Sequence, residues 1–437
     1  MRKHTFKSNI ASVALTQGII FALSFIMSIL TARLLGPAGV GVFTLLILLQ
    51  HLGMRITDFG FSRAFRYYSA NGEIHYYELK SIVFILGTIV GLCTILISLI
   101  LRYLPINIWN DIDLEVYVLF LPTIFFFSLS MYMRYLLHGQ LLINTVNISQ
   151  LLESALNLIF FVFFVWYLNL GLIGVSLSFS ICSIIIFIQL FLKMKKYTPA
   201  SICNNTDKWQ NVKKLWGYGQ WSYYSAFIEY IFINFPVLLL KASMGSFDLI
   251  GYFNKAKGLS ELPNRGVVPL STLLFSYNAG SSADTAAKRT EILCRFSFWA
   301  MTVIYALVAL IIKPLISFLY GSAFLPAAEI FYYLYPYAVF FVQSIFLSTA
   351  IAARGFNKDT FTIRLISLPI IIIVLYCLVT YMGIVGAAIA ISFSFFVLWL
   401  QYALKYKKIT GSGFKEFFLM KESDFLLLKN LSLKILS

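Results

Sequence analysis

Long runs of hydrophobic residues fill the chain, separated by short segments that contain polar residues, glycine or proline. An α-helix needs about 20 apolar residues to cross a bilayer. Proline is tolerated in such a helix where neighbouring helices satisfy the freed backbone groups. The pattern therefore predicts an all-α integral membrane protein with twelve transmembrane helices. The predicted spans are 10–32, 39–57, 80–101, 116–137, 147–167, 170–192, 219–240, 249–273, 294–312, 330–352, 363–381 and 384–404.

The amino-acid composition indicates that lipid surrounds most of the protein's surface. Of the 437 residues, 60% are hydrophobic and 12% charged, with a mean hydropathy of +0.84. An ordinary soluble domain carries about 25% charged residues, and no soluble fold has enough interior to bury this much apolar surface. The first apolar run follows basic residues, as in a signal peptide. It is too long for one and lacks a clear cleavage site, so we expect a retained first span.

The positive charges are unevenly distributed over the segments between the spans, although the net charge is +16. With the N-terminus in the cytoplasm, most lysines and arginines fall on the inner side, including Arg134, Arg295 and Arg364. Those on the outer side are Arg33, Arg102, Lys241 and Lys313. This bias predicts that both termini are cytoplasmic. Nucleic-acid binding, another function of basic chains, needs a clustered basic face on a folded domain, and none is visible.

Glycine-containing motifs recur at a nearly constant separation along the chain. The matched pairs are Gly36 with Gly245, Gly41 with Gly251, Phe43 with Phe253, Gly171 with Gly383 and Gly174 with Gly386. A fixed shift of this kind favours an internal duplication. Because a repeat of six spans preserves orientation, the two halves are expected to be parallel repeats about an axis along the membrane normal.

The repeat predicts two six-helix lobes. The N-terminal lobe covers residues 1–192 and the C-terminal lobe 219–404. A basic cytoplasmic linker, 193–218, joins them, and a basic cytoplasmic tail, 405–437, follows.

Four stretches of the sequence resemble a known family. They are ARLLGPAGVGVF, TDFGFSRAFRYYSA, LISFLYGSAFLPAAEIF and GIVGAAIA. In this order and spacing they resemble the polysaccharide-exporter family, the O-antigen (Wzx-type) flippases, across nearly all twelve spans. This family belongs to the multidrug/oligosaccharidyl-lipid/polysaccharide exporter superfamily, which also holds multidrug exporters and the lipid II flippase.

The resemblance implies a flippase in the bacterial inner membrane and not an enzyme. Its cargo would be a polyprenyl-diphosphate-linked oligosaccharide, the repeat unit of an O-antigen, capsule or exopolysaccharide, turned outward by alternating access. No cofactor is expected. A polysaccharide polymerase and a chain-length regulator are possible partners. The energy source is open: a coupling ion, H⁺ or Na⁺, acting through Glu229 or Glu261, or consumption of the product downstream.

The eighth predicted span, IGYFNKAKGLSELPNRGVVPL, carries charge where the bilayer should exclude it. A charge at mid-bilayer costs about 2.5–3.5 kcal/mol on insertion scales and is retained only beside a partner or a water-filled cavity. Two prolines in the segment also favour a cavity. The residues that we expect to share one helical face are Asn254, Lys257, Glu261, Asn264 and Arg265.

These residues, together with Lys255, are the predicted binding site for an anionic headgroup. Glu229, near the centre of the seventh span, is the expected partner of one of the cations. The alternative is that Lys257, Arg265 and the two glutamates only neutralise one another between helices. Cation remains after that pairing, which favours the binding role.

A second cationic group lies at the inner end of the second span. Arg55, Asp58, Arg63 and Arg66 fall within RITDFGFSRAFRYY. Either they anchor the chain at the lipid surface, or the arginines meet the diphosphate as the cargo enters. The planar fork of arginine binds two phosphate oxygens at once, which suits the second role.

Other functions find less support in the residues. There is no GxxxxGK[ST] motif for a nucleotide-driven motor, and the cysteines and histidines are too scattered for a metal site. A membrane-bound glycan polymerase or ligase should carry a large charged outer loop, but the outer loops here are modest. A drug or cation exporter of the same superfamily should favour acidic cavity residues, whereas this chain sets Lys255, Lys257 and Arg265 beside its carboxylates.

Overall fold

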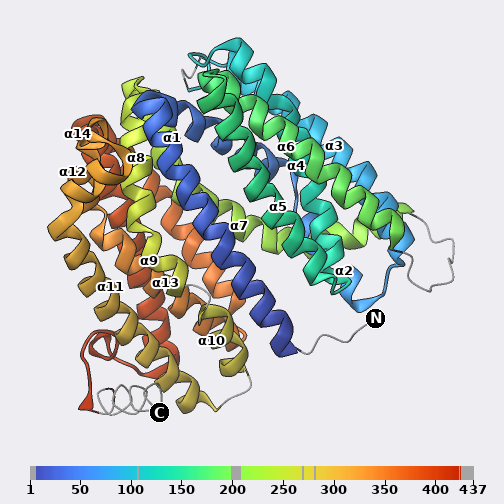
Figure 1. The fold of residues 1–437 in the computed structure, drawn as a ribbon. Coiled ribbons are helices and arrows are strands. Elements are labelled where there is room, and N and C mark those ends of the chain that lie inside the picture. Colours follow the sequence, from blue (N-terminus) through green and yellow to red (C-terminus); the bar gives the residue numbers. More distant parts are fainter. Residues whose placement is uncertain are drawn as a thin grey trace. The chain divides into compact units, whose positions relative to one another are not determined.

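Helices form almost all of the computed structural model, which describes residues 6–105, 108–197, 208–267, 270–279, 282–422 and 424. No strand occurs within these ranges, so the predicted all-α class is confirmed (Figure 1). The α-helices are α1 (Phe6–Thr57), α2 (Phe61–Asn71), α3 (Tyr76–Tyr103), α4 (Leu114–Gly139), α5 (Ile143–Phe161), α6 (Gly171–Lys196), α7 (Lys208–Met244), α8 (Phe247–Ser260), α9 (Leu262–Val267), α10 (Leu270–Ala279), α11 (Ala283–Tyr320), α12 (Pro326–Tyr333), α13 (Tyr335–Ala353) and α14 (Asn357–Thr410). The shorter helical segments are η1 (Val162–Tyr167), η2 (Ser322–Phe324) and η3 (Phe414–Phe417).

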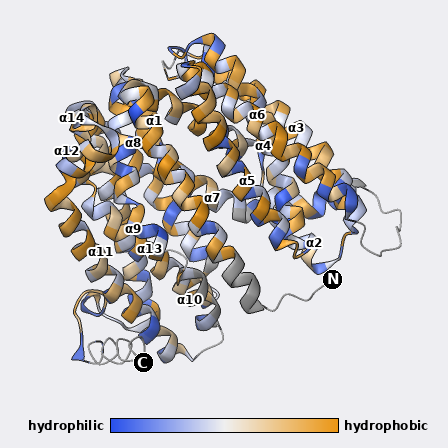
Figure 2. Ribbon diagram, in the orientation of Figure 1, coloured by the Kyte–Doolittle hydropathy of each residue, from blue (hydrophilic) through white to orange (hydrophobic). Residues whose placement is uncertain are grey.

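Nine helical segments in the described part of the chain are long and apolar enough to cross a membrane. Hydrophobic residues run along their length (Figure 2). Large apolar side chains such as Leu310, which is 82% exposed, lie at the surface. In a soluble protein such a surface would be unstable in water, whereas lipid accommodates it. The chain is a multi-pass membrane protein. The count of twelve spans stays a prediction.

Two of the long helices each contain two of the predicted spans, joined at a glycine. Gly36 interrupts α1 with φ 66° and ψ −177°, and Gly383 interrupts α14 with φ 57° and ψ −129°. Their matched positions in the repeat, Gly245 and Gly171, also have positive φ, 69° and 54°. A side chain with a Cβ rarely adopts this conformation, so the repeated glycines mark the same turn in each half.

The eighth predicted span does not form one helix. The chain leaves α8 after Ser260, turns at Glu261 and continues as α9 and α10. Pro263 accounts for the break, because it has no N–H to continue the hydrogen-bond ladder and its ring would clash with the preceding turn. Pro269 lies outside the described residues.

The polar connection after the second span contains a helix that the hydrophobic pattern did not predict. This helix, α2, follows Gly60 and ends at Gly72, both with positive φ. Its buried side chains, among them Phe65 and Ser69, face α4: the ring of Phe65 lies 5.3 Å from that of Tyr132, and the Ser69 hydroxyl donates to the Leu136 carbonyl. Figure 2 shows hydrophilic residues gathered at this helix.

The chain divides into two units. The first comprises Met1–Phe227 and Gly245–Gly251, and the second Ile228–Met244 and Tyr252–Ser437. Within the first, α3, α4, α5 and α6 pack side by side, and within the second α11, α13 and α14 do so (Figure 1). The predicted lobe boundaries stay a prediction. Residues 198–207 of the linker, and residues 423 and 425–437 of the tail, lie outside the described residues.

Two backbone contacts in the first unit mirror each other. A Cβ on Gly41 would lie 2.0 Å from the carbonyl oxygen of Phe247, and a Cβ on Gly251 would lie 2.2 Å from that of Pro37. The shift that carries Gly41 onto Gly251 also carries Pro37 onto Phe247. The contacts are therefore reciprocal, and each needs a glycine because any side chain would collide with backbone.

Candidate functional site

Lys257 and Glu261 of the predicted binding site are held by protein groups. The Lys257 ammonium lies 3.5 Å from Glu261 Oε1 and donates to the Ile233 carbonyl oxygen at 3.2 Å. The hydroxyl of Tyr337, on α13, donates to the same carboxylate oxygen of Glu261. These contacts join α8 and the turn after it to α7 and α13 within the second unit. The neutralisation alternative predicts such a contact for Lys257 and Glu261.

The other polar residues of the segment have different surroundings. Lys255 is buried, and its ammonium lies 5.1 Å from the centre of the Tyr320 ring in a cation–π contact. Asn254 is partly buried, and Arg265 is exposed near the end of α9. The prediction of one shared helical face is therefore wrong beyond Glu261, because the helix breaks there.

Asn264 is the least satisfied of these side chains. It is 3% exposed, and neither its amide oxygen nor its amide nitrogen has a hydrogen-bond partner among the described residues. A buried amide in native proteins almost always has a partner, because burying it unpaired costs about 1–3 kcal/mol. This side chain can therefore donate to and accept from a ligand that reaches the broken segment.

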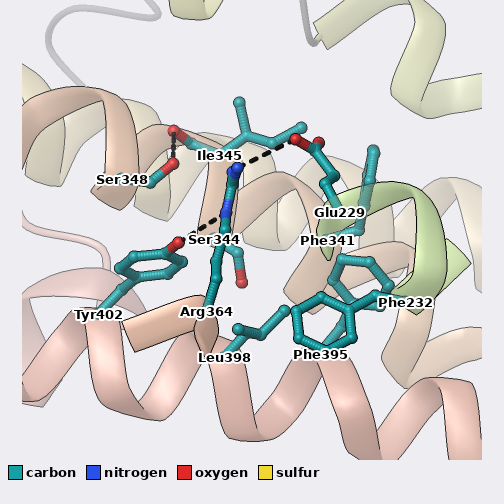
Figure 3. Close-up of a pocket in the computed structure, with 10 residues that line it drawn as sticks. All are labelled: Glu229, Phe232, Phe341, Ser344, Ile345, Ser348, Arg364, Phe395, Leu398 and Tyr402. Atoms are coloured by element: carbon teal, nitrogen blue, oxygen red, sulfur yellow. Dashed lines mark hydrogen bonds and ion pairs between the residues drawn. The ribbon is translucent and has the colours of Figure 1, made fainter. Parts of the chain in front are cut away.

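Glu229 pairs with Arg364, and not with a cation of the eighth span. Its Oε2 lies 3.1 Å from Arg364 Nη1, and Arg364 Nε donates to the hydroxyl of Tyr402 at 3.0 Å. Figure 3 shows the guanidinium between these two partners. The predicted partner was wrong because Arg364, at the start of an apolar run, was assigned only a place in the inner connecting segments.

A small pocket surrounds this pair in the second unit. The space open to the centre of a water molecule is about 20 Å³, enough for about one water. Phe232 and Phe341 form apolar walls, while Ser344 and Ser348 add polar groups (Figure 3). The Arg364 side chain is 19% exposed and that of Glu229 41%, so the carboxylate is the more accessible member of the pair.

The second predicted group separates into one structural residue and three exposed ones. The buried Asp58 carboxylate accepts hydrogen bonds from the backbone N–H groups of Gly60 and Ser62, at 3.2 and 3.0 Å, and from the Ser62 hydroxyl at 2.9 Å. It thereby holds the turn that starts α2. The exposed members are Arg55, Arg63 and Arg66. Only the arginines have the exposure that a diphosphate contact needs.

Sequence reasoning missed an ion pair in the first unit. Arg134 Nη2 lies 2.6 Å from Glu153 Oε2, and Arg134 Nε donates to the Ser149 hydroxyl at 3.0 Å. The signal that could have found it is Glu153 itself, since an acidic residue inside a predicted span needs a partner. Arg134 had been counted only as an inner-side charge.

A second missed pair holds the segment after α14. Arg295 Nε and Nη2 donate to the two carboxylate oxygens of Asp424, at 2.7 and 2.9 Å, and Nη1 donates to the Glu416 carbonyl at 2.9 Å. The Trp299 indole donates to the Phe418 carbonyl at 2.8 Å. Hydrogen bonds from Arg295 hold the pKa of Asp424 below its usual value. No sequence signal links residues so far apart.

Comparison of the sequence with family models identifies the family of this chain. Residues 6–275, more than half of the chain, match the model of the polysaccharide biosynthesis protein family. The chain belongs to this family. Comparison with curated proteins gave no match.

Solved structures that are similar to this chain include transporters of the MOP superfamily. A multidrug resistance MATE family transporter of the MOP superfamily, in an inward-facing conformation, is similar with a TM-score of 0.75 and 13% identity over 93% of this chain and 99% of that one. The lipid II flippase MurJ, in an inward closed conformation, is similar with a TM-score of 0.71 and 17% identity over 93% of this chain and 88% of that one. The predicted family resemblance is confirmed, and the relatives are transporters rather than catalysts, as predicted.

A third similar structure differs in the polarity of its site. It is a MOP superfamily transporter from Pyrococcus furiosus, with a TM-score of 0.61 and 17% identity over 93% of this chain and 96% of that one. It is described as having a binding pocket of reverse polarity that suggests a different function. Pocket charge therefore varies among proteins that share this fold.

Proposed function

We propose that this family member is a flippase for a polyprenyl-diphosphate-linked oligosaccharide, the repeat unit of a cell-surface polysaccharide, and that it works by alternating access in the bacterial inner membrane. Both termini lie in the cytoplasm. Family membership and the fold shared with the lipid II flippase support a lipid-linked glycan as cargo. A coupling ion acting through Glu229 or Glu261, and a polymerase and chain-length regulator as partners, belong to the same proposal.

The observation that carries the proposal is the composition of the broken eighth span. Within the predicted span 249–273, Lys255, Lys257 and Arg265 bring three positive charges, against the single carboxylate of Glu261. Beside them lies the buried Asn264 amide, which has no partner among the described residues. A drug or cation exporter with this fold would need the opposite sign of charge. The cationic excess favours an anionic cargo.

Neutralising Lys257 and Arg265, one at a time, tests the proposal. In the cargo-binding role, Lys257→Gln and Arg265→Ala each remove a charge-assisted contact of about 1.5–3 kcal/mol, roughly a 10- to 150-fold loss of affinity. We expect the purified chain in vesicles to lose transport of a short prenyl diphosphate that carries one sugar, measured by access of an external lectin to the sugar. Arg265→Lys should retain part of it, because the charge remains while the fork is lost.

Two comparisons separate cargo binding from helix packing. The double variant Lys257→Gln/Glu261→Gln leaves no unpaired buried charge, so full recovery of transport would show that the pair only joins helices and would contradict the proposal. Lys288→Ala, which removes an exposed lysine of α11, is the charge-matched control and should transport normally. Protein content of the vesicles is measured for every variant, so that loss of folding is not taken for loss of binding.

A further inference from the structure

Exposed tyrosines and arginines form one surface on α2 and the first part of α7, both in the first unit. Arg63, Arg66 and Tyr67 are three and four residues apart, so they share the outer face of α2. The ring of Tyr67 stacks on that of Tyr218, with centroids 4.1 Å apart and planes at 15°. Tyr68 meets the two rings edge-on, at 5.2 and 5.9 Å. We call these five residues the tyrosine–arginine surface.

The rings are fixed in place but remain open to solvent. Tyr67 is 41% exposed and Tyr218 is 45% exposed, although each is packed against the other. Partial burial raises the pKa of Tyr218, and the positive charge of Arg63 opposes that rise. Arginine charge and aromatic ring area are therefore presented together.

The backbone beneath this surface is tightly constrained. Gly60, before α2, packs on Gly219 of α7 so closely that a Cβ on Gly60 would lie 2.3 Å from the Gly219 carbonyl oxygen. Phe59 has a φ of 45°, which is rare for a large side chain, and its ring is 49% exposed. The Phe59 ring lies 5.7 Å from that of Tyr223, further along α7. Residues held in such sparsely populated backbone conformations cluster at functional sites.

We infer that the tyrosine–arginine surface binds the head of the cargo before translocation, with the sugar next to the diphosphate packed on an outer face of the stacked Tyr67–Tyr218 pair. One face of a sugar ring is lined by C–H groups, which pack against the electron-rich face of an aromatic ring. The arginines bind the adjoining phosphates through paired N–H donors. This inference rests on the proposed cargo and adds a subsite that recognises the sugar.

Placement outside the candidate spans fits this role. Helix α2 lies between the candidate spans Leu15–Thr57 and Tyr76–Tyr103, and Tyr218 precedes the candidate span Tyr223–Met244. A head at this position keeps its sugar in water while the prenyl tail stays in the bilayer. The competing occupant is the lipid surface itself, since tyrosine and arginine also anchor proteins at membrane interfaces.

The test compares two probes on the purified full chain in detergent: geranyl diphosphate, and geranyl diphosphate carrying N-acetylglucosamine. Wild type should bind the sugar-bearing probe more tightly by roughly two- to tenfold, the range of an aromatic stacking contact. The double variant Tyr67→Ala/Tyr218→Ala should abolish this difference and bind geranyl diphosphate as before. Arg63→Ala should weaken both probes equally. Tyr67→Phe should keep the difference, because the ring remains.

Controls separate this inference from the proposed function. Tyr103→Ala removes a tyrosine that is 75% exposed at the far end of α3 and should change neither affinity. If wild type binds the diphosphate but the sugar adds nothing, the inference is refuted while the proposed function stands. If wild type binds neither probe, the proposed function fails. Equal displacement of both probes by phosphatidylglycerol, lost in the double alanine variant, would assign the surface to membrane lipid instead.

Discussion

Replacing Asp424 by asparagine should release the segment that follows α14 from α11. Arg295 and Asp424 are 3% and 0% exposed, and two hydrogen bonds join them. Removing one member of a buried ion pair costs about 3–5 kcal/mol, because the other charge stays buried without compensation. Glu416 Oε2, 3.7 Å from Arg295 Nη1, supplies part of that compensation. We therefore expect the lower value, about 3 kcal/mol, a roughly 150-fold shift toward the undocked segment.

Hydrogen exchange measures this equilibrium directly. The amides of Glu416, Phe418 and Leu419 donate within the docked turn, so each exchanges only when the turn opens. In the purified chain, Asp424→Asn should accelerate their exchange roughly 100-fold. Glu416→Gln is the control: the Glu416 carboxylate is 30% exposed and lies 3.7 Å from Arg295, so its loss should cost about 0–1 kcal/mol, at most roughly fivefold. Equal acceleration in both variants, or none in Asp424→Asn, would refute the reasoning.

The same pair predicts a dependence on pH with a definite sign. Because Arg295 lowers the pKa of Asp424 from its usual 3.8 in the folded state, the pair stabilises docking at every pH above that value. Its contribution is lost as the pH falls through the lowered pKa. After correction for the intrinsic exchange rate, wild type should open increasingly in this acidic range, whereas Asp424→Asn should show no such step.

Two further predictions test contacts, one in each unit. Gly60→Ala should reduce the yield of folded protein far more than Gly72→Ala. Both positions have positive φ, but only a Cβ at Gly60 would collide with the Gly219 backbone. Fluorescence-detected size-exclusion chromatography compares the two yields. Glu229→Gln and Arg364→Gln should each lower thermal stability by about 1–3 kcal/mol, and the double variant by less than their sum; additive losses would show that the ion pair contributes nothing.

Apolar run length and glycine spacing predicted the class of fold and its turns. Gly36 and Gly383 were expected at repeated turns, and both adopt positive φ. These features are local, since a span needs a fixed length of apolar chain and a turn needs a residue without a Cβ. Helix α2 escaped prediction because its exposed face, with Arg63 and Arg66, is as polar as a connecting loop.

The ion-pair partners of charged side chains could not be predicted from the sequence in the same way. Each charge in an apolar run implies a partner, so Glu229 was correctly expected to have one, yet the choice of Arg364 depends on how α7 and α14 pack. Likewise, Pro263 signalled broken backbone in the eighth span, but not that the break would bury Asn264 and leave Arg265 exposed. Which charged residues form ion pairs depends on how the helices pack. The spacing of residues along one sequence does not determine that packing.

The reciprocal glycine contacts follow a pattern that is also found in homodimers. When residue i of one copy touches residue j of another and j touches i in return, the copies are related by a two-fold axis. Gly41 on Phe247 and Gly251 on Pro37 reproduce that relation within one chain. Each contact has its own glycine in this chain, so a substitution at Gly41 or at Gly251 would disturb one contact and leave the other intact.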